Sequence, residues 1–219
     1  MKPVKRMIQD IEREVGFTAG MIGRQELDPR VMEAVKKVPR EEFVPVESRG
    51  YAYENGPLPI GHGQTISQPY IVALMTDLLE PEPDHVVLEV GTGSGYQAAI
   101  LSLLVERVYS IEIVEPLARA ARARLRRLGY GNIEIRVADG YHGWAEHAPF
   151  DGIVVTAAAP VIPEPLVEQL KPGGRLVIPV GQPYSYQELM LVEKSEDSQV
   201  KTKDVLGVAF VPLTGKHHD

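Results

Sequence analysis

Cysteine is absent from this 219-residue sequence. Its absence excludes a disulfide, a thiolate nucleophile and a cysteine-based metal site. Histidine, aspartate and glutamate also show no spacing that is typical of a metal site, so we expect no bound metal. His217 and His218 lie in a polar C-terminal stretch, and we interpret them as tail residues.

Positive charge is scarce. The chain has 23 Lys and Arg residues against 30 Asp and Glu residues, which gives a formal net charge of −7. This balance argues against a broad basic surface that faces phosphates, so we expect no nucleic-acid partner. The arginines between positions 119 and 127 have the spacing of the exposed side of an amphipathic helix.

Long apolar runs are missing as well. No stretch approaches the ~20 apolar residues needed to cross a membrane, and the charged N-terminus lacks the apolar core of a signal peptide. We therefore expect a cytoplasmic protein without a membrane partner, and a monomer. The length and the ordinary composition, 44% hydrophobic and 24% charged, predict a single domain over residues 1–219.

From residue 85 onward, short apolar runs alternate with amphipathic segments. This pattern is typical of a doubly wound α/β fold, in which helices cover both faces of a mostly parallel sheet. The predicted strands are His85–Val90, Arg107–Ile111, Ile133–Ala138, Gly152–Thr156, Arg175–Val180, Gln187–Glu193 and Val205–Val211. The predicted helices are Tyr96–Val105, Pro116–Leu128 and Pro163–Gln169. We divide the domain into an N-terminal extension (1–83), a cofactor-binding core (84–180) and C-terminal strands (181–219), with Lys194–Asp204 as a surface connection.

The N-terminal extension has a different character. Asp28 and Pro29 predict the start of a short helix over Val31–Val38. The segment Phe43–Gln68 is rich in Pro, Gly and Tyr and has little periodicity. A compact domain rarely contains such a long irregular segment without a use for it. Two interpretations stay open, a substrate-binding or lid element and an extended arm packed on the sheet.

A glycine-rich loop follows the first predicted strand. Leu88–Val90 lead into Gly91, Thr92, Gly93, Ser94 and Gly95, and a helix follows from Tyr96. Glycine permits positive φ and lets a ligand approach the main chain without meeting a Cβ atom. The loop therefore predicts a nucleotide-type site, although tight strand-to-helix turns use glycine for structural reasons too.

Acidic residues at three strand ends strengthen this prediction. Glu89 precedes the glycines, Glu112 follows 23 residues later at the end of the second strand, and Asp139 with Gly140 ends the third. Ligands bind at this carboxyl edge of open α/β sheets. The third glycine comes one residue too early for the Gly-x-Gly-x-x-Gly dinucleotide loop, which disfavours a dehydrogenase.

These residues resemble the class I methyltransferase pattern. The resemblance implies S-adenosyl-L-methionine as cofactor and S-adenosyl-L-homocysteine as product, with Glu112 at the ribose and Asp139 near the adenine. It also implies a Rossmann-like strand order of 3-2-1-4-5 for the parallel strands. The loop Ala157–Pro160 has no side chain that could hold a flipped base, so a nucleic-acid base is disfavoured as substrate.

Nearly the whole chain, from about residue 31 to 214, resembles the protein-L-isoaspartate O-methyltransferases. The matching segments, in order, are Val38–Arg40, Phe43–Pro45, Pro57–Gly61, Gly63–Pro69, Leu88–Gly95, Phe150–Pro160, Leu170–Gly174 and Phe210–Leu213. The segment Gln64–Pro69 is distinctive, because generic methyltransferases lack it. Tyr70 and Ala209 depart from the family, in which many members carry His and many bacterial members carry Arg at these positions.

The resemblance implies methylation of the free α-carboxylate of L-isoaspartyl residues in damaged proteins and peptides, with Ser67 as an active-site residue. The ester then collapses to a succinimide without the enzyme, which begins repair. Thr65 and Ser67 could donate hydrogen bonds that orient the carboxylate. Ser67 could equally cap the helix that starts near Pro69. We also predict Val208–Leu213 as an edge strand, which could pair with the peptide or be an ordinary core strand.

Two other functions remain open on the sequence. One is a class I methyltransferase that acts on a small molecule or an RNA. The other is a catalytically silent adenosine-binding or interaction protein, which the intact set of Glu89, Glu112, Asp139 and glycine loop disfavours.

Overall fold

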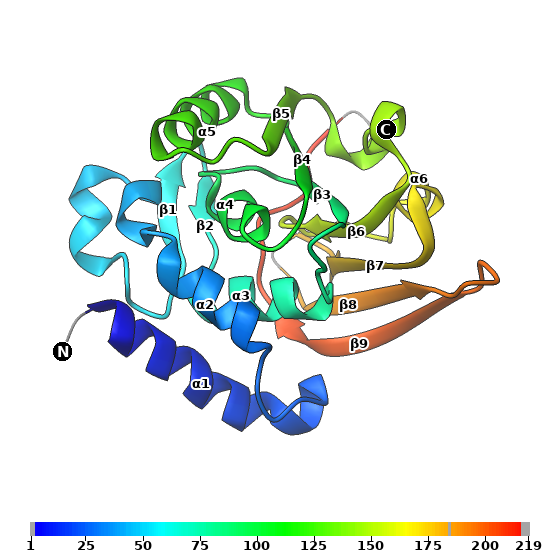
Figure 1. Cartoon of the computed structure of the whole chain (residues 1–219), viewed down its shortest axis with the longest axis horizontal. Coiled ribbons are helices and arrows are strands. Elements are labelled where there is room, and N and C mark those ends of the chain that lie inside the picture. The colour runs from blue at the N-terminus through cyan, green and yellow to red at the C-terminus, as the bar shows by residue number, and fades with distance from the viewer. Residues whose placement is uncertain (1–2, 184, 216–219) are drawn as a thin grey trace.

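The computed structural model describes residues 3–183 and 185–215, and its central feature is a twisted sheet (Figure 1). In the described residues the sheet has seven strands in the order β5-β4-β3-β6-β7-β8-β9. These strands are β3 (Val86–Val90), β4 (Arg107–Glu112), β5 (Ile133–Val137), β6 (Phe150–Val155), β7 (Leu170–Gly181), β8 (Gln187–Lys194) and β9 (Val200–Val208). His217 and His218 lie outside the described residues.

The first five strands of this sheet are parallel, and β8 and β9 are antiparallel. In chain order the parallel part reads 3-2-1-4-5, which confirms the predicted order. The helices between these strands are α4 (Tyr96–Ser102), α5 (Glu115–Leu128) and α6 (Glu164–Glu168), with short 3-10 turns at η3 (Gly140–His142) and η4 (Ala145–His147). The predicted α/β class is therefore confirmed.

Alternate residues of the strands enter two separate cores. On one face, side chains such as Val87, Val108 and Val154 join the helices α1 to α5. On the other face, side chains such as Leu88 and Ile153 pack with α6 and with Trp144, which precedes η4. Because successive side chains of a strand point to opposite faces, one apolar run supplies both layers. This explains why the central strands are mostly apolar; the buried polar residues Glu89, Ser110 and Glu112 are the exceptions.

Three helices of the N-terminal extension cover the first face (Figure 1). They are α1 (Pro3–Ile22), α2 (Pro29–Lys37) and α3 (Pro69–Leu78). The predicted start of α2 is confirmed, since Asp28 caps the helix by accepting the N–H of Arg30. Helix α1 was not predicted, although Met7, Ile11 and Val15 recur every four residues and are buried.

The irregular segment 43–68 folds locally. It contains the 3-10 helix η2 (Val46–Tyr51) and a small two-stranded sheet of β1 (Leu58–Gly61) and β2 (Gln64–Ile66); the 3-10 helix η1 (Arg40–Phe43) precedes it. The two strands pair with each other and not with the main sheet. The segment nevertheless reaches the glycine-rich loop, because the Ile60 side chain lies against Gly93.

Two predictions for the C-terminal part were wrong. Lys194–Asp204 is only partly a connection, because β9 begins at Val200; polar residues are tolerated there since β9 is the edge of the sheet and mostly exposed. The stretch Val208–Leu213 is not an edge strand. After Val208 the chain turns back, and Ala158 donates to the carbonyl of Val211 while Leu213 donates to that of Ala158, both at 2.8 Å.

No helix within residues 3–183 and 185–215 combines the length and the apolar character that crossing a bilayer would require.

Candidate active site

The glycine-rich loop joins β3 to α4 with left-handed backbone at its three glycines. Gly91, Gly93 and Gly95 have φ values of 96°, 52° and 88°. A Cβ atom at Gly91 would overlap the hydroxyl of Thr156, which donates to the carbonyl of Gly91 at 2.7 Å. At Gly95 the side chain of Leu125 leaves little room. Glycine is therefore required by backbone conformation and by packing.

Glu89 is fully buried beneath this loop. One carboxylate oxygen accepts a short hydrogen bond from Ser110, whose hydroxyl is paired with that of Thr92 at 2.5 Å. The other oxygen, Oε1, makes no hydrogen bond of normal geometry in the part of the chain that the structure describes, although the backbone N–H of Ala98 lies near the carboxylate. Burial raises the pKa of Glu89 to about 8; the hydrogen bond from Ser110 opposes this change, and the nearby charge of Glu112 adds to it.

Glu112 stands at the end of β4 and organises the same loop. Its carboxylate accepts the N–H of Gly93 at 2.8 Å and the N–H of Val114 at 2.9 Å. A carboxylate has about four acceptor positions, so two remain for a ligand. Glu112 therefore ties the loop to the second strand and still presents acceptors to the cavity.

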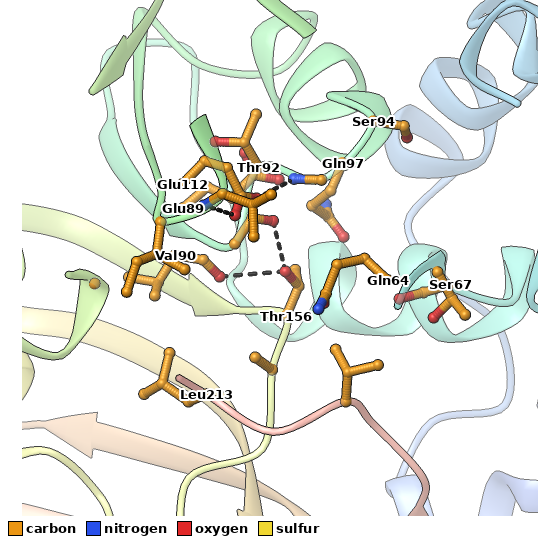
Figure 2. Close-up of a pocket in the computed structure, with 18 of the residues that line it drawn as sticks. Gln64, Ser67, Glu89, Val90, Thr92, Ser94, Gln97, Glu112, Thr156 and Leu213 are labelled. Carbon is orange, nitrogen blue, oxygen red and sulfur yellow. Dashed lines mark hydrogen bonds between the residues drawn. The ribbon is translucent and has the colours of Figure 1, made fainter. Parts of the chain in front are cut away.

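These residues surround a cavity that Figure 2 shows in close-up. We call it the loop cavity; its lining includes Glu89, Gly91, Thr92, Gly93, Ser94, Gln97, Glu112, Gly140 and Thr156, and also Gln64, Thr65 and Ser67 from the extension. Gly95, by contrast, does not line it. The sequence-predicted set is thus brought together with two exceptions, Gly95 and Asp139.

Asp139 stands beside the loop cavity residue Gly140 without lining the cavity itself. Its carboxylate accepts the N–H of Tyr141 at 3.0 Å and lies against Gly215, where a Cβ atom would overlap it. Gly140 does line the cavity, and a Cβ atom there would collide with Val90. Asp139 is therefore not among the lining residues of the loop cavity, whereas Gly140 is.

A second hollow adjoins the loop cavity. We call it the outer groove; it lies between α1, the segment 57–71 and the end of β9, and it is lined by Glu14, Thr18, Pro57, Thr65, Ser67, Gln68, Tyr70, Ile71, Tyr186 and Leu206–Phe210. Thr65 and Ser67 line both hollows. These two hydroxyl residues therefore stand where the hollows meet.

The side chain of Ser67 does not cap α3, contrary to one interpretation of the sequence. Gln68 is the N-cap residue, and no side-chain hydrogen bond caps the helix. The hydroxyls of Thr65 and Ser67 make no hydrogen bond within the described residues, whereas the carbonyl of Ser67 accepts one from Arg40. Both hydroxyls are free to contact a ligand.

Several cavity residues were missed from the sequence. Gln97 donates to Thr76 at 2.8 Å, and its Oε1 atom has no partner in the described structure. Leu213 closes the opposite wall, as Figure 2 shows. No local pattern marks either residue, because Gln97 lies inside a helix and Leu213 arrives from the far end of the chain.

Comparisons with known proteins show the family of the chain. Residues 21–218 match the family described as protein-L-isoaspartate(D-aspartate) O-methyltransferase. The chain is 64% identical over 212 residues to protein-L-isoaspartate O-methyltransferase 2 of Syntrophobacter fumaroxidans, covering 97% of this chain and 86% of that protein. It is also 64% identical over 217 residues to the protein of the same name in Nitrosococcus oceani, covering 99% of both.

Solved structures show the same relationship. A protein-L-isoaspartate O-methyltransferase superposes with a TM-score of 0.81 at 28% identity, over 97% of this chain and 66% of that chain. The Plasmodium falciparum protein-L-isoaspartate O-methyltransferase, solved in complex with S-adenosyl-L-homocysteine, superposes with a TM-score of 0.76 at 26% identity, over 96% of this chain and 97% of that one.

Proposed function

The chain belongs to the protein-L-isoaspartate(D-aspartate) O-methyltransferase family, and we propose that one of its two adjoining hollows binds the cofactor and the other binds the substrate. The enzyme methylates the free α-carboxylate of L-isoaspartyl residues in damaged proteins, with S-adenosylmethionine as methyl donor. In our proposal the loop cavity holds the cofactor and the outer groove holds the peptide. The single observation that carries it is that Thr65 and Ser67 line both hollows.

The loop cavity fits this cofactor. Two buried acceptors, Oε1 of Glu89 and Oε1 of Gln97, make no hydrogen bond of normal geometry in the described residues, and both residues line the cavity. An ammonium group supplies the hydrogen bonds that such acceptors need. Glu112 offers further acceptors for ribose hydroxyls, while Gly91–Gly95 with Gly140 supply the close main-chain surface. When bound, the cofactor supplies an electrophilic methyl group on a sulfonium.

The residues at the junction are suited to orient a carboxylate. A substrate carboxyl group with a pKa near ~4 is already ionised at neutral pH, so no general base is required. Thr65 lies in β2 and Ser67 two residues later, with Ile66 buried between them. The two side chains therefore lie on the same side, and their free hydroxyls can donate to the two carboxylate oxygens.

Cations are absent from the described lining of both hollows, which contains no Lys, Arg or His residue. A direct guanidinium partner would hold the carboxylate strongly and reduce its nucleophilicity. Neutral hydroxyl donors orient the group at less cost to its reactivity. The remaining task of the enzyme is in-line placement of the reacting atoms in a site that excludes water.

The test compares two synthetic peptides that are identical except for L-isoaspartyl in place of L-aspartyl. Transfer of labelled methyl from S-adenosylmethionine is measured for the wild type and for Ser67→Ala. We expect base-labile label on the isoaspartyl peptide alone, and at least a tenfold lower kcat/KM for the variant. Label on neither peptide, with cofactor binding intact, would overturn the substrate assignment and favour a small molecule or an RNA.

We further propose that residues 1–219 act as one domain and as a monomer in the cytoplasm. The lack of cysteine is compatible with a reducing compartment. Light scattering coupled to size exclusion should give a mass near the 24.2 kDa of the chain. A dimer mass would refute the monomer.

A further inference from the structure

Arg40 is a buried arginine whose guanidinium reaches the carbonyl of Ser67. We propose that Arg40 is a positioning residue for methyl transfer, which fixes the main chain of Ser67 and thereby aims its hydroxyl at the substrate carboxylate. This inference rests on the proposed function, because it concerns the same junction of loop cavity and outer groove. Arg40 itself lines neither hollow.

The guanidinium joins three segments of the chain. Its Nε donates to the carbonyl of Ala52 at 2.8 Å, and its Nη2 donates to the carbonyls of Ser67 at 2.8 Å and Gly56 at 3.4 Å. The side chain is fully buried. A guanidinium is planar and its donors diverge at fixed angles, so one group sets the relative positions of all its acceptors. Arg40 therefore ties the loop 52–56 to the residue at the reaction site.

The burial of this cation is costly, and no acidic group offsets the cost. Within the described residues Arg40 has no ion pair, and its Nη1 has no hydrogen-bond partner. Its charge lies 4.8 Å from the ring centre of Tyr96. Burial lowers the pKa of Arg40, and Tyr96 opposes that change. Replacing Arg40 would leave the carbonyls of Ala52, Gly56 and Ser67 without this donor, so its effect on stability must be measured apart from its effect on kcat.

A second contact supports the same loop from the other side of Ser67. The N–H of Tyr70 donates to Oδ1 of Asn55 at 3.1 Å. The main chain is thus connected to the loop 52–56 at two points, at Ser67 through Arg40 and at Tyr70 through Asn55. Since its own side chain caps nothing, the direction of its hydroxyl depends on how the main chain is held. Loss of Arg40 removes the tie to Ser67 itself, whereas α3 keeps its first-turn hydrogen bond from Val72 to Gln68.

The experiment uses the full chain with Arg40→Met and Arg40→Lys, beside the wild type. Melting temperature, affinity for S-adenosyl-L-homocysteine, and kcat and KM for an L-isoaspartyl peptide are measured for each. We expect kcat of Arg40→Met to fall at least 30-fold, since misplacement by about 1 Å can cost about 100-fold. Cofactor affinity should stay within about threefold, because Arg40 does not line the loop cavity. Arg40→Lys should also have a lower kcat, because a single ammonium group cannot donate to all the separated carbonyls that the planar guanidinium reaches.

Arg175→Met is the matched control. Arg175 donates to the carbonyl of Leu78, at the opposite end of α3, at 3.2 Å, and pairs with Glu80 and Glu193. It should lose stability without a comparable fall in kcat. Equal falls in kcat for Arg175→Met and Arg40→Met at equal stability would overturn the inference. If Arg40→Met does not fold, wild-type kcat in Arg40→Lys would overturn it.

The two failures are distinguishable. A wild type that is inactive on the isoaspartyl peptide would overturn the proposed function and this inference together. An active wild type with unchanged kcat in Arg40→Met would overturn this inference alone.

Discussion

Replacing Glu89 by glutamine should stabilise the protein at pH 8 and abolish a proton release that accompanies cofactor binding. Burial raises the pKa of this carboxyl from its usual 4.5 to about 8. Between these two pH values the folded protein keeps a proton that the unfolded chain has released. The contribution of Glu89 to stability is therefore complete at low pH and falls as the pH rises from 4.5 towards 8.

The size of the effect follows from the same change. At about 1.4 kcal/mol for each pH unit, raising the pKa from 4.5 to about 8 penalises folding by about 5 kcal/mol once the group must ionise, as an order of magnitude. Glutamine resembles the protonated carboxyl and carries no such penalty. We expect Glu89→Gln to lie within about 1 kcal/mol of the wild type in stability near pH 5 and to exceed it by about 4 kcal/mol near pH 8.

Cofactor binding, unlike folding, should favour the ionised carboxylate of Glu89 over glutamine. If the Oε1 atom accepts a hydrogen bond from the cofactor's ammonium group, the complex favours the ionised carboxylate. Below pH 8 the wild type must then release about one proton on binding, and affinity should rise up to about tenfold per pH unit between pH 6 and 8. The glutamine variant should bind S-adenosyl-L-homocysteine more weakly and without this pH dependence.

Two assays test the argument. Urea unfolding at pH 5 and pH 8 gives the stabilities, and titration calorimetry in buffers of different ionisation enthalpy counts the released protons. Glu115→Gln, at an exposed position on α5, is the control and should change neither result. Equal pH dependence of stability in wild type and Glu89→Gln, or equal proton release, would refute the reasoning.

Three further predictions concern the loop and the groove. Gly91→Ala should weaken S-adenosyl-L-homocysteine binding at least tenfold, because its Cβ would displace Thr156 and φ is 96°; calorimetry with unchanged affinity would contradict this. Glu14 is the one charged residue in the described lining of the outer groove. Peptides with Lys beside the isoaspartyl residue should therefore have a KM about two- to fivefold lower than peptides with Glu there, and Glu14→Gln should remove the difference. Tyr70→Phe removes the 2.5 Å hydrogen bond with Thr18 and should cost about 1 kcal/mol, or about 3 °C in Tm; an unchanged Tm would show that the bond contributes nothing.

The sheet and the loop cavity were largely predictable because local sequence dictates them. Apolar strands that end in glycine or a carboxylate place ligand groups at one edge, and Glu89, Glu112 and Gly91–Ser94 are found there together. The resemblance, in addition to this local pattern, supplied the strand order. The predicted boundaries of the last strand, Val205–Val211, were wrong because an edge strand such as β9 can carry polar residues on both faces.

The rest depends on contacts between distant segments. The sequence around Ser67 is typical of a helix cap, yet its carbonyl accepts a hydrogen bond from Arg40, which lies 27 residues earlier. Asp139 ends a strand as predicted, but Gly215 lies against its carboxylate. Met7, Ile11 and Val15 have the helical spacing of α1, but the many charged residues between them obscure this apolar stripe.

The late return of the chain to the loop cavity has a consequence for synthesis. Val211 and Leu213 pair with Ala158, and Leu213 forms part of the cavity wall. Translation delivers these residues after every strand of the sheet. Until they have left the ribosome, this wall is missing. The cofactor can therefore add its full binding energy only once residue 213 has emerged, and not to a shorter nascent chain.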